Sequence, residues 1–269
     1  MAALVIAAGP GSAAAGPACD DPIDDPIAVP WRDAGFDGGR AACLGPAVNL
    51  TVRGRALIDA PAFYGTLGGD AVVGLRVREG RHVEWGLAAR GLDLTFLQNA
   101  VWKVIEPSYG PLLVSSAVGV ERALAGRPLA LALATTIELP FTRSQLGGST
   151  GAVQLAGVAT WRARARLRLH ARVALLGWYG ADVTGATVRG AAAASVDASA
   201  RVVRWLAVDV GLDAQAGWYG VTLDHVAVRV GARWRVKGPW RAEVGAGAPV
   251  VGRERQDLVV TLGVARDLD

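Results

Sequence analysis

The residues from Ala165 to Gly180 alternate between two kinds of side chain with a period of two. The apolar phase contains Leu167, Leu169, Ala171, Val173 and Leu175, and the polar phase contains Arg166, Arg168, His170 and Arg172. A strand places alternate residues on opposite faces, whereas a helix would scatter these arginines around its surface. The stretch therefore predicts a two-faced strand with about ten residues of apolar face, the length that a tilted strand needs to cross a membrane.

The same alternation recurs from Ala47 to the end of the chain and predicts about twelve strands. Their expected ranges are 47–59, 70–79, 82–97, 111–123, 128–140, 151–163, 165–178, 188–200, 203–217, 225–236, 239–250 and 257–266. The connections alternate between long loops and short turns such as Lys237-Gly238-Pro239. This alternation favours an all-β, up-and-down antiparallel transmembrane β-barrel over residues 47–269. The third strand changes phase at Arg90-Gly91, which predicts a β-bulge there.

The aromatic residues decide between a membrane barrel and a soluble β protein, because both classes show period-two alternation. At the predicted short-turn ends are Trp85, Trp161, Trp205, Trp234 and Trp240, and at the predicted long-loop ends are Trp178, Tyr179, Trp218 and Tyr219. Two belts of aromatic residues are typical of the two interfaces of a membrane barrel. We therefore interpret these nine residues as an aromatic girdle.

Three segments are expected along the chain: a signal peptide over residues 1–18, a periplasmic lead-in over 19–46, and the barrel. Cys19 and Cys43 are the only cysteines, and two cysteines in an exported chain most simply form a disulfide. A lipid-modified Cys19 is the alternative. The doubled Asp-Asp-Pro-Ile of residues 20–27 lacks the ligand spacing of a calcium loop, so we interpret it as solvated chain and predict no metal.

The polar phase faces the lumen if the apolar phase faces lipid, and arginine dominates it. The predicted pore-lining residues are Arg53, Arg55, Arg90, Arg166, Arg168, His170, Arg172 and Arg229. Arginines around a pore favour anions. The alternative is that these arginines pair with lumen carboxylates and fill the barrel.

The second long connection, from Gln98 to Gly110, is unusually apolar for a loop. It could extend the neighbouring strands beyond the membrane, or it could fold inward and narrow the lumen. We hypothesise the inward fold, with Trp102 and Lys103 in a constriction loop.

The alternating strands, the aromatic belts and the arginine-rich inner phase resemble Gram-negative outer-membrane β-barrels, and among them channels that admit acidic oligosaccharides. The resemblance implies an outer-membrane location, contact with outer-membrane lipid and lipopolysaccharide, and passive or weakly anion-selective diffusion of small anionic solutes. The chain departs from that class at its end, Arg266-Asp267-Leu268-Asp269, where an aromatic residue is usual.

Other functions fit the sequence less well. A plugged barrel with a structural or adhesive role is the main alternative, and an outer-membrane hydrolase or a secreted soluble β protein is a weaker one. The three histidines fall in separate parts of the predicted barrel, and the His-x-Ser-Asn signature of outer-membrane phospholipase is missing, so we predict neither an enzyme nor a cofactor. The net charge of +4 comes from arginines at strand spacing, so nucleic-acid binding is not expected. The oligomeric state is left open.

Overall fold

The computed structural model describes residues 42–44, 48–59, 64–79, 82–90, 92–99, 103–109, 112–139, 148–182, 185–217, 222–252 and 258–268. The strands are β1 (Val48–Asp59), β2 (Tyr64–Glu79), β3 (Val83–Arg90), β4 (Leu92–Asn99), β5 (Lys103–Tyr109), β6 (Leu112–Leu124), β7 (Arg127–Leu139), β8 (Gly148–Arg164), β9 (Leu167–Asp182), β10 (Gly185–Val203), β11 (Leu206–Gly217), β12 (Thr222–Lys237), β13 (Trp240–Gly252) and β14 (Leu258–Leu268). No helix in these ranges is both long enough and apolar enough to cross a membrane.

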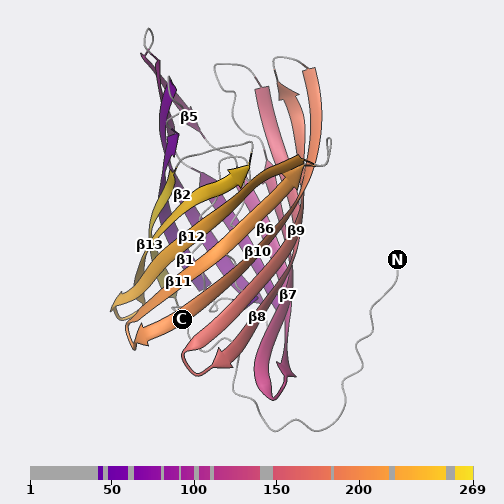
Figure 1. Cartoon of the computed structure of the whole chain (residues 1–269), viewed down its shortest axis with the longest axis vertical. Helices are drawn as coiled ribbons and strands as arrows, with labels where there is room; N and C mark the ends of the chain where they lie inside the picture. Colours follow the sequence, from indigo (N-terminus) through magenta and orange to yellow (C-terminus); the bar gives the residue numbers. More distant parts are fainter. Residues whose placement is uncertain are drawn as a thin grey trace.

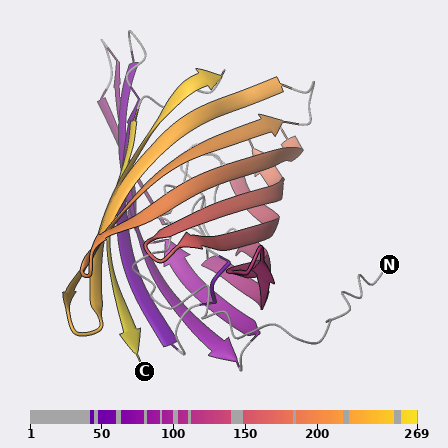
Figure 2. The same cartoon turned by 60° about the horizontal axis from the view of Figure 1, so that its bottom comes forward.

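The strands form one closed antiparallel sheet (Figures 1 and 2). Closure occurs because β1 pairs with β2 on one side and with β14 on the other, so that Leu50 lies opposite both Leu75 and Arg266. Counted around the wall, β3 continues into β4 and β5 continues into β6, which gives the predicted twelve up-and-down strands. The all-β barrel prediction is confirmed.

The predicted bulge lies at the junction of β3 and β4. On the facing strand β2, Val72 pairs with Arg90 and Gly69 pairs with Leu94. Three residues on the β3–β4 side therefore oppose two residues on β2, which is the one-residue excess of a β-bulge. This confirms the expectation drawn from the phase change at Arg90-Gly91.

The second long connection differs from its expected conformation. Lys103–Tyr109 forms β5, which pairs with β4 from Gln98↔Lys103 to Leu92↔Tyr109. The β4–β5 hairpin projects above the rim in Figure 1, so the hypothesis of an inward-folded constriction loop is wrong and the alternative of extended strands is right. Antiparallel pairing satisfies the backbone of this segment along the wall. Trp102 lies outside the described residues.

Short turns connect the strands at one end of the barrel, as the sequence indicated. Between β6 and β7, Ala125 and Gly126 have φ values of 51° and 70°, and Gly238 between β12 and β13 has φ of 55°. Two successive residues at positive φ are the requirement of a type I′ turn, which matches the twist of the strands that it joins.

The outer wall is apolar and the inner wall is made of small and polar residues. Val173 and Leu133 on the outer face are 64% and 56% exposed, whereas Ala174 and Ala134, one position further along the same strands, are buried. A barrel with its large apolar residues on the outside requires hydrocarbon around it, because exposure of so much apolar surface to water is unfavourable. The apolar phase therefore faces a membrane.

Candidate functional site: the inner wall of the barrel

The inner wall has two regions of different composition. The alanine wall is formed by β7, β8 and β9 and consists of Ala130, Ala132, Ala156, Val158 and Ala174. The charged wall is formed by β10 to β13 and consists of Asp197, Asp209, Asp213, Arg229, Arg233, Arg241 and Glu243. All of these side chains are buried.

The segment Ala42–Leu44 lies against the alanine wall. Ala42 is 2% exposed and belongs to the same buried cluster as Ala130 and Ala156, and Cys43 packs against this cluster. Only small side chains leave room on the wall for a backbone segment to approach. The last described residues of the predicted lead-in therefore lie against the inner wall of the barrel.

A buried hydrogen bond fixes the backbone of this segment to β8. The Ala42 N–H donates to Thr160 Oγ1 over 3.0 Å, and Thr160 Oγ1 lies 2.9 Å from Nδ1 of His170 on β9. A hydroxyl can accept one hydrogen bond while it donates another, so Thr160 links the segment to His170. The buried amide of Ala42 is thereby satisfied.

Leu44 packs over Gly119 on β6. A Cβ atom at Gly119 would lie 3.2 Å from Leu44 Cγ and 3.5 Å from the carbonyl oxygen of Leu131. The absence of a side chain at Gly119 therefore leaves room for Leu44 on β6, next to the alanine wall. Cys19 lies outside the described residues, so its disulfide with Cys43 stays a prediction.

On the charged wall, one arginine bridges two carboxylates. Arg229 Nη2 on β12 lies 2.6 Å from Asp197 Oδ1 on β10, and Arg229 Nε contacts Asp213 Oδ2 on β11. Arg229 is 1% exposed. Gly211 on β11 lies between Asp197 and Arg229 in register, and a Cβ atom there would collide with the Asp197 carboxylate. Glycine is therefore what allows an ion pair to cross a strand.

A second ion pair joins two adjacent strands further around the wall. Arg233 Nη2 on β12 lies 3.2 Å from Glu243 Oε2 on β13. The next strand carries Gly263 opposite Glu243, where a Cβ atom would lie 2.6 Å from Glu243 Oε1. Arg53 on β1 pairs with Gly263 in the backbone register.

The predicted pore-lining residues occupy different environments. Arg168 and His170 are buried in β9, and Arg172 on the same strand is half-buried. Arg166 lies in the exposed short turn between β8 and β9, at the end of the barrel, and its place in the pore stays a prediction. The side chains of Arg53, Arg55, Arg90 and Lys103 are outside the described residues.

The aromatic girdle requires one correction. Trp178 packs against the buried inner cluster of Ala152, Leu176 and Ala191, so it belongs to the inner face. Consecutive strand residues point to opposite faces, and the neighbouring Tyr179 is therefore on the outer face. Its hydroxyl donates to the Glu138 carbonyl over 3.0 Å, across Gly151.

The other girdle residues fall at the ends of strands or outside the described chain. Trp85, Trp205 and Trp240 are exposed at the short-turn end, and Trp161 and Trp234 are half-buried there. Trp218 and Tyr219 lie outside the described residues.

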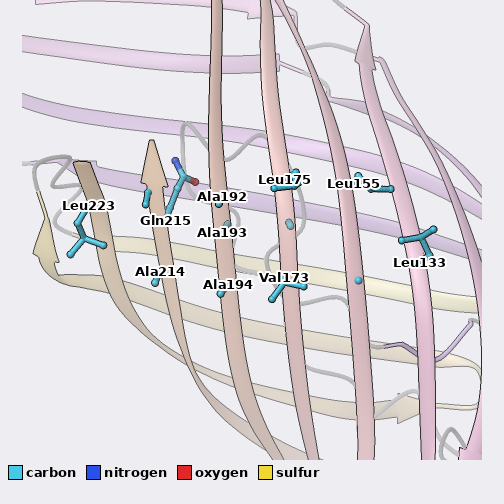
Figure 3. Close-up of a pocket in the computed structure, with 13 residues that line it drawn as sticks. Leu133, Leu155, Val173, Leu175, Ala192, Ala193, Ala194, Ala214, Gln215 and Leu223 are labelled. Atoms are coloured by element: carbon cyan, nitrogen blue, oxygen red, sulfur yellow. The ribbon is translucent and has the colours of Figure 1, made fainter. Parts of the chain in front are cut away.

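An apolar hollow of about 530 Å³ lies over β7 to β12 (Figure 3). Its lining includes the small side chains of Ala192, Ala194 and Ala214 and the larger ones of Leu155, Val173 and Leu223. The exposed leucine and valine side chains belong to the membrane-facing phase. This hollow therefore faces hydrocarbon and is separate from the inner wall.

Comparison with solved structures supports the fold. The chain is similar to an outer membrane channel from Pseudomonas putida F1, with a TM-score of 0.66 and 10% identity over 86% of this chain and 98% of that one. The fold is that of a Gram-negative outer-membrane β-barrel. The β domain of the Bordetella autotransporter BrkA has a TM-score of 0.58 and 11% identity, over 82% of this chain and 100% of that one. The NanC porin has a TM-score of 0.54 and 8% identity, over 81% and 100%.

No family model matches the sequence, and no curated protein matches it. Within the described ranges, no group of three or more His, Cys, Asp or Glu side chains is arranged to hold a metal ion. The described contacts of the inner wall are hydrogen bonds, ion pairs and small apolar contacts.

Proposed function

We propose that this protein is an outer-membrane channel for the passive diffusion of small solutes, and that Ala42–Leu44 narrows its lumen. The observation that carries the proposal is the position of this segment on the inner wall of a closed barrel, anchored by the Ala42–Thr160 hydrogen bond. The similarity in fold to outer membrane channels supports the same conclusion. A segment that lies against the inner wall narrows the lumen and so restricts the size of the solutes that can pass.

We propose a weak preference for anions. Arg229 and Arg233 have carboxylate partners, so their charges are largely compensated within the wall. Arg168 and Arg172 lie on β9, one of the strands of the alanine wall, and face the lumen in phase with His170, so they are candidates for an influence on permeating ions. A lumen charge acts on permeation through its field in a space of low effective dielectric.

Planar-bilayer recording tests this proposal. The wild type should conduct, and its reversal potential under a salt gradient should indicate a small excess of anion current. Arg172→Gln should shift the reversal potential toward cations, whereas Arg166→Gln removes the same charge from an exposed turn and should not. Equal shifts in the two variants would contradict a lumen site for selectivity.

A plugged barrel with a structural or adhesive role is the second candidate. Two observations favour it: the buried ion pairs of the charged wall, and the β4–β5 hairpin that projects beyond the rim. Removal of residues 19–46 distinguishes the two candidates. A channel narrowed by its own segment should conduct in the wild type and conduct more after the deletion, whereas silence of both proteins would favour the plugged barrel.

A further inference from the structure

The short-turn end of the barrel carries an excess of exposed positive charge. The cationic rim consists of the exposed residues Arg78, Arg122, Arg127, Arg164, Arg166, Arg204, Arg235, Lys237 and Arg266. Among the described residues at this end, only Glu79 and Glu121 are exposed carboxylates. Every short turn contributes to the rim, so the charge surrounds the barrel and does not form one patch.

The tryptophans at this end indicate where the rim lies relative to the membrane. Trp85, Trp205 and Trp240 are 52%, 52% and 42% exposed. Exposed tryptophans on a barrel mark the level of the lipid headgroups. The guanidinium carbon of Arg266 lies 5.2 Å from the centre of the Trp240 ring, so at least one cation of the rim is held at this level.

Three arginines of the rim lie on the lipid-facing phase. Arg122 follows the exposed Val118 by four positions, Arg127 precedes the exposed Leu133 by six, and Arg266 follows the exposed Val264 by two. An even separation in a strand keeps side chains on one face. Arg122, Arg127 and Arg266 therefore place positive charge on the outer face, at the short-turn edge of the apolar surface. Arg78, Arg166 and Arg235 lie on the opposite phase.

We propose that the cationic rim binds the anionic headgroups of phospholipids in the membrane leaflet at the short-turn end, through Arg122, Arg127 and Arg266. A guanidinium group matches the paired oxygens of a phosphate, and an aromatic ring beside it covers the upper part of the acyl chains. A ring of separate arginines suits many small mobile ligands around the barrel better than one large partner. The proposal rests on the barrel spanning a membrane and is independent of conduction.

The rim tryptophans are built-in probes for the experiment. The full chain is refolded into vesicles of phosphatidylcholine mixed with an equal amount of phosphatidylglycerol, with bromine on the acyl chains of one lipid or the other. Quenching of tryptophan fluorescence then reports which lipid is enriched beside the protein. We expect phosphatidylglycerol to be enriched on the order of tenfold at low ionic strength and progressively less as salt is added.

The variants separate lipid binding from general attraction. Most of the enrichment should be lost in the triple variant Arg122→Gln, Arg127→Gln and Arg266→Gln. The control is the triple variant Arg78→Gln, Arg166→Gln and Arg235→Gln, which removes the same charge from the other phase and should retain the enrichment. Inorganic phosphate at matched ionic strength should not compete if lipid is the ligand. Equal quenching by the two lipids in the wild type, or loss of enrichment in the control alone, would overturn the proposal. Heat-modified gel mobility verifies that each variant has folded.

Discussion

The alanine wall and the charged wall line the same lumen but make space in opposite ways. On β7 to β9, small side chains leave room for the backbone of Ala42–Leu44. On β10 to β14, glycines such as Gly211 and Gly263 leave room for long side chains to cross from strand to strand. The first wall receives a segment from elsewhere in the sequence, whereas the second wall is filled by its own residues.

The two walls differ in how easily their contacts can be broken. Ion pairs buried on the charged wall depend on each other, because removal of one partner leaves the other charged and desolvated. The described contacts of Ala42 with the alanine wall are an apolar cluster and the hydrogen bond to Thr160, so release of Ala42 would not separate an ion pair of the charged wall. We expect the charged wall to control stability and the alanine wall to control passage.

The largest effect is expected from the charged wall at Arg229. Arg229→Ala leaves Asp197 and Asp213 buried without their shared cation, which should lower the free energy of unfolding by about 3–5 kcal/mol. Urea titration of the refolded protein in vesicles, followed by tryptophan fluorescence, measures the change. Arg164→Ala at the exposed end of β8 is the control and should shift stability by less than about 0.5 kcal/mol. Recovery by Asp197→Asn and Asp213→Asn in an Arg229→Met background would sharpen the assignment.

A smaller effect is expected at the glycine beneath the same ion pair. Gly211→Ala places a methyl group where the Asp197 carboxylate lies, and the displaced ion pair should cost about 1–3 kcal/mol in the same titration. Gly177→Ala provides the matched control, because a Cβ atom at Gly177 meets nothing within 4 Å. If both variants lost the same stability, general glycine effects would explain the result.

The smallest effect is expected on the alanine wall. Thr160→Val removes the acceptor of the Ala42 N–H, so that segment should detach about fivefold more often, which corresponds to about 1 kcal/mol. Hydrogen–deuterium exchange at the Ala42 amide measures this opening. Thr135→Val on the outer face of β7 should leave the exchange rate unchanged. An unaltered rate in Thr160→Val would show that packing alone holds the segment.

The wall of the barrel could be predicted from the sequence because its rule is local. Alternation at period two places Val173 and Ala174 on opposite faces without knowledge of any partner strand, and the phase change at Arg90-Gly91 locates the bulge. The same rule could have placed Trp178 inward, because two consecutive aromatic residues cannot share a face. The β4–β5 hairpin was one of two alternatives, and the apolar content of the segment did not distinguish them.

The contents of the lumen could not be predicted in the same way. The bridge from Asp197 to Arg229 depends on the register of three strands, and only that register shows why Gly211 lies between them. The contact between Ala42 and Thr160 joins residues that no local pattern relates. A partial signal existed in the alanines at inward positions of β7, β8 and β9, where a water-filled lumen would favour polar residues.

The pairing of β1 with β14 has a consequence for how the molecule is made. These strands lie at opposite ends of the barrel sequence, and the hydrogen bonds between them complete the ring. The hairpins from β6 to β14 join neighbours in the chain, so they can form early, whereas closure requires the most distant pairing and should be slow. Ala42–Leu44 lies only a few residues before β1, which begins at Val48, so the strand that closes the ring is also the strand nearest in sequence to this inner segment. We therefore expect closure of the ring and entry of this segment to occur close together in time.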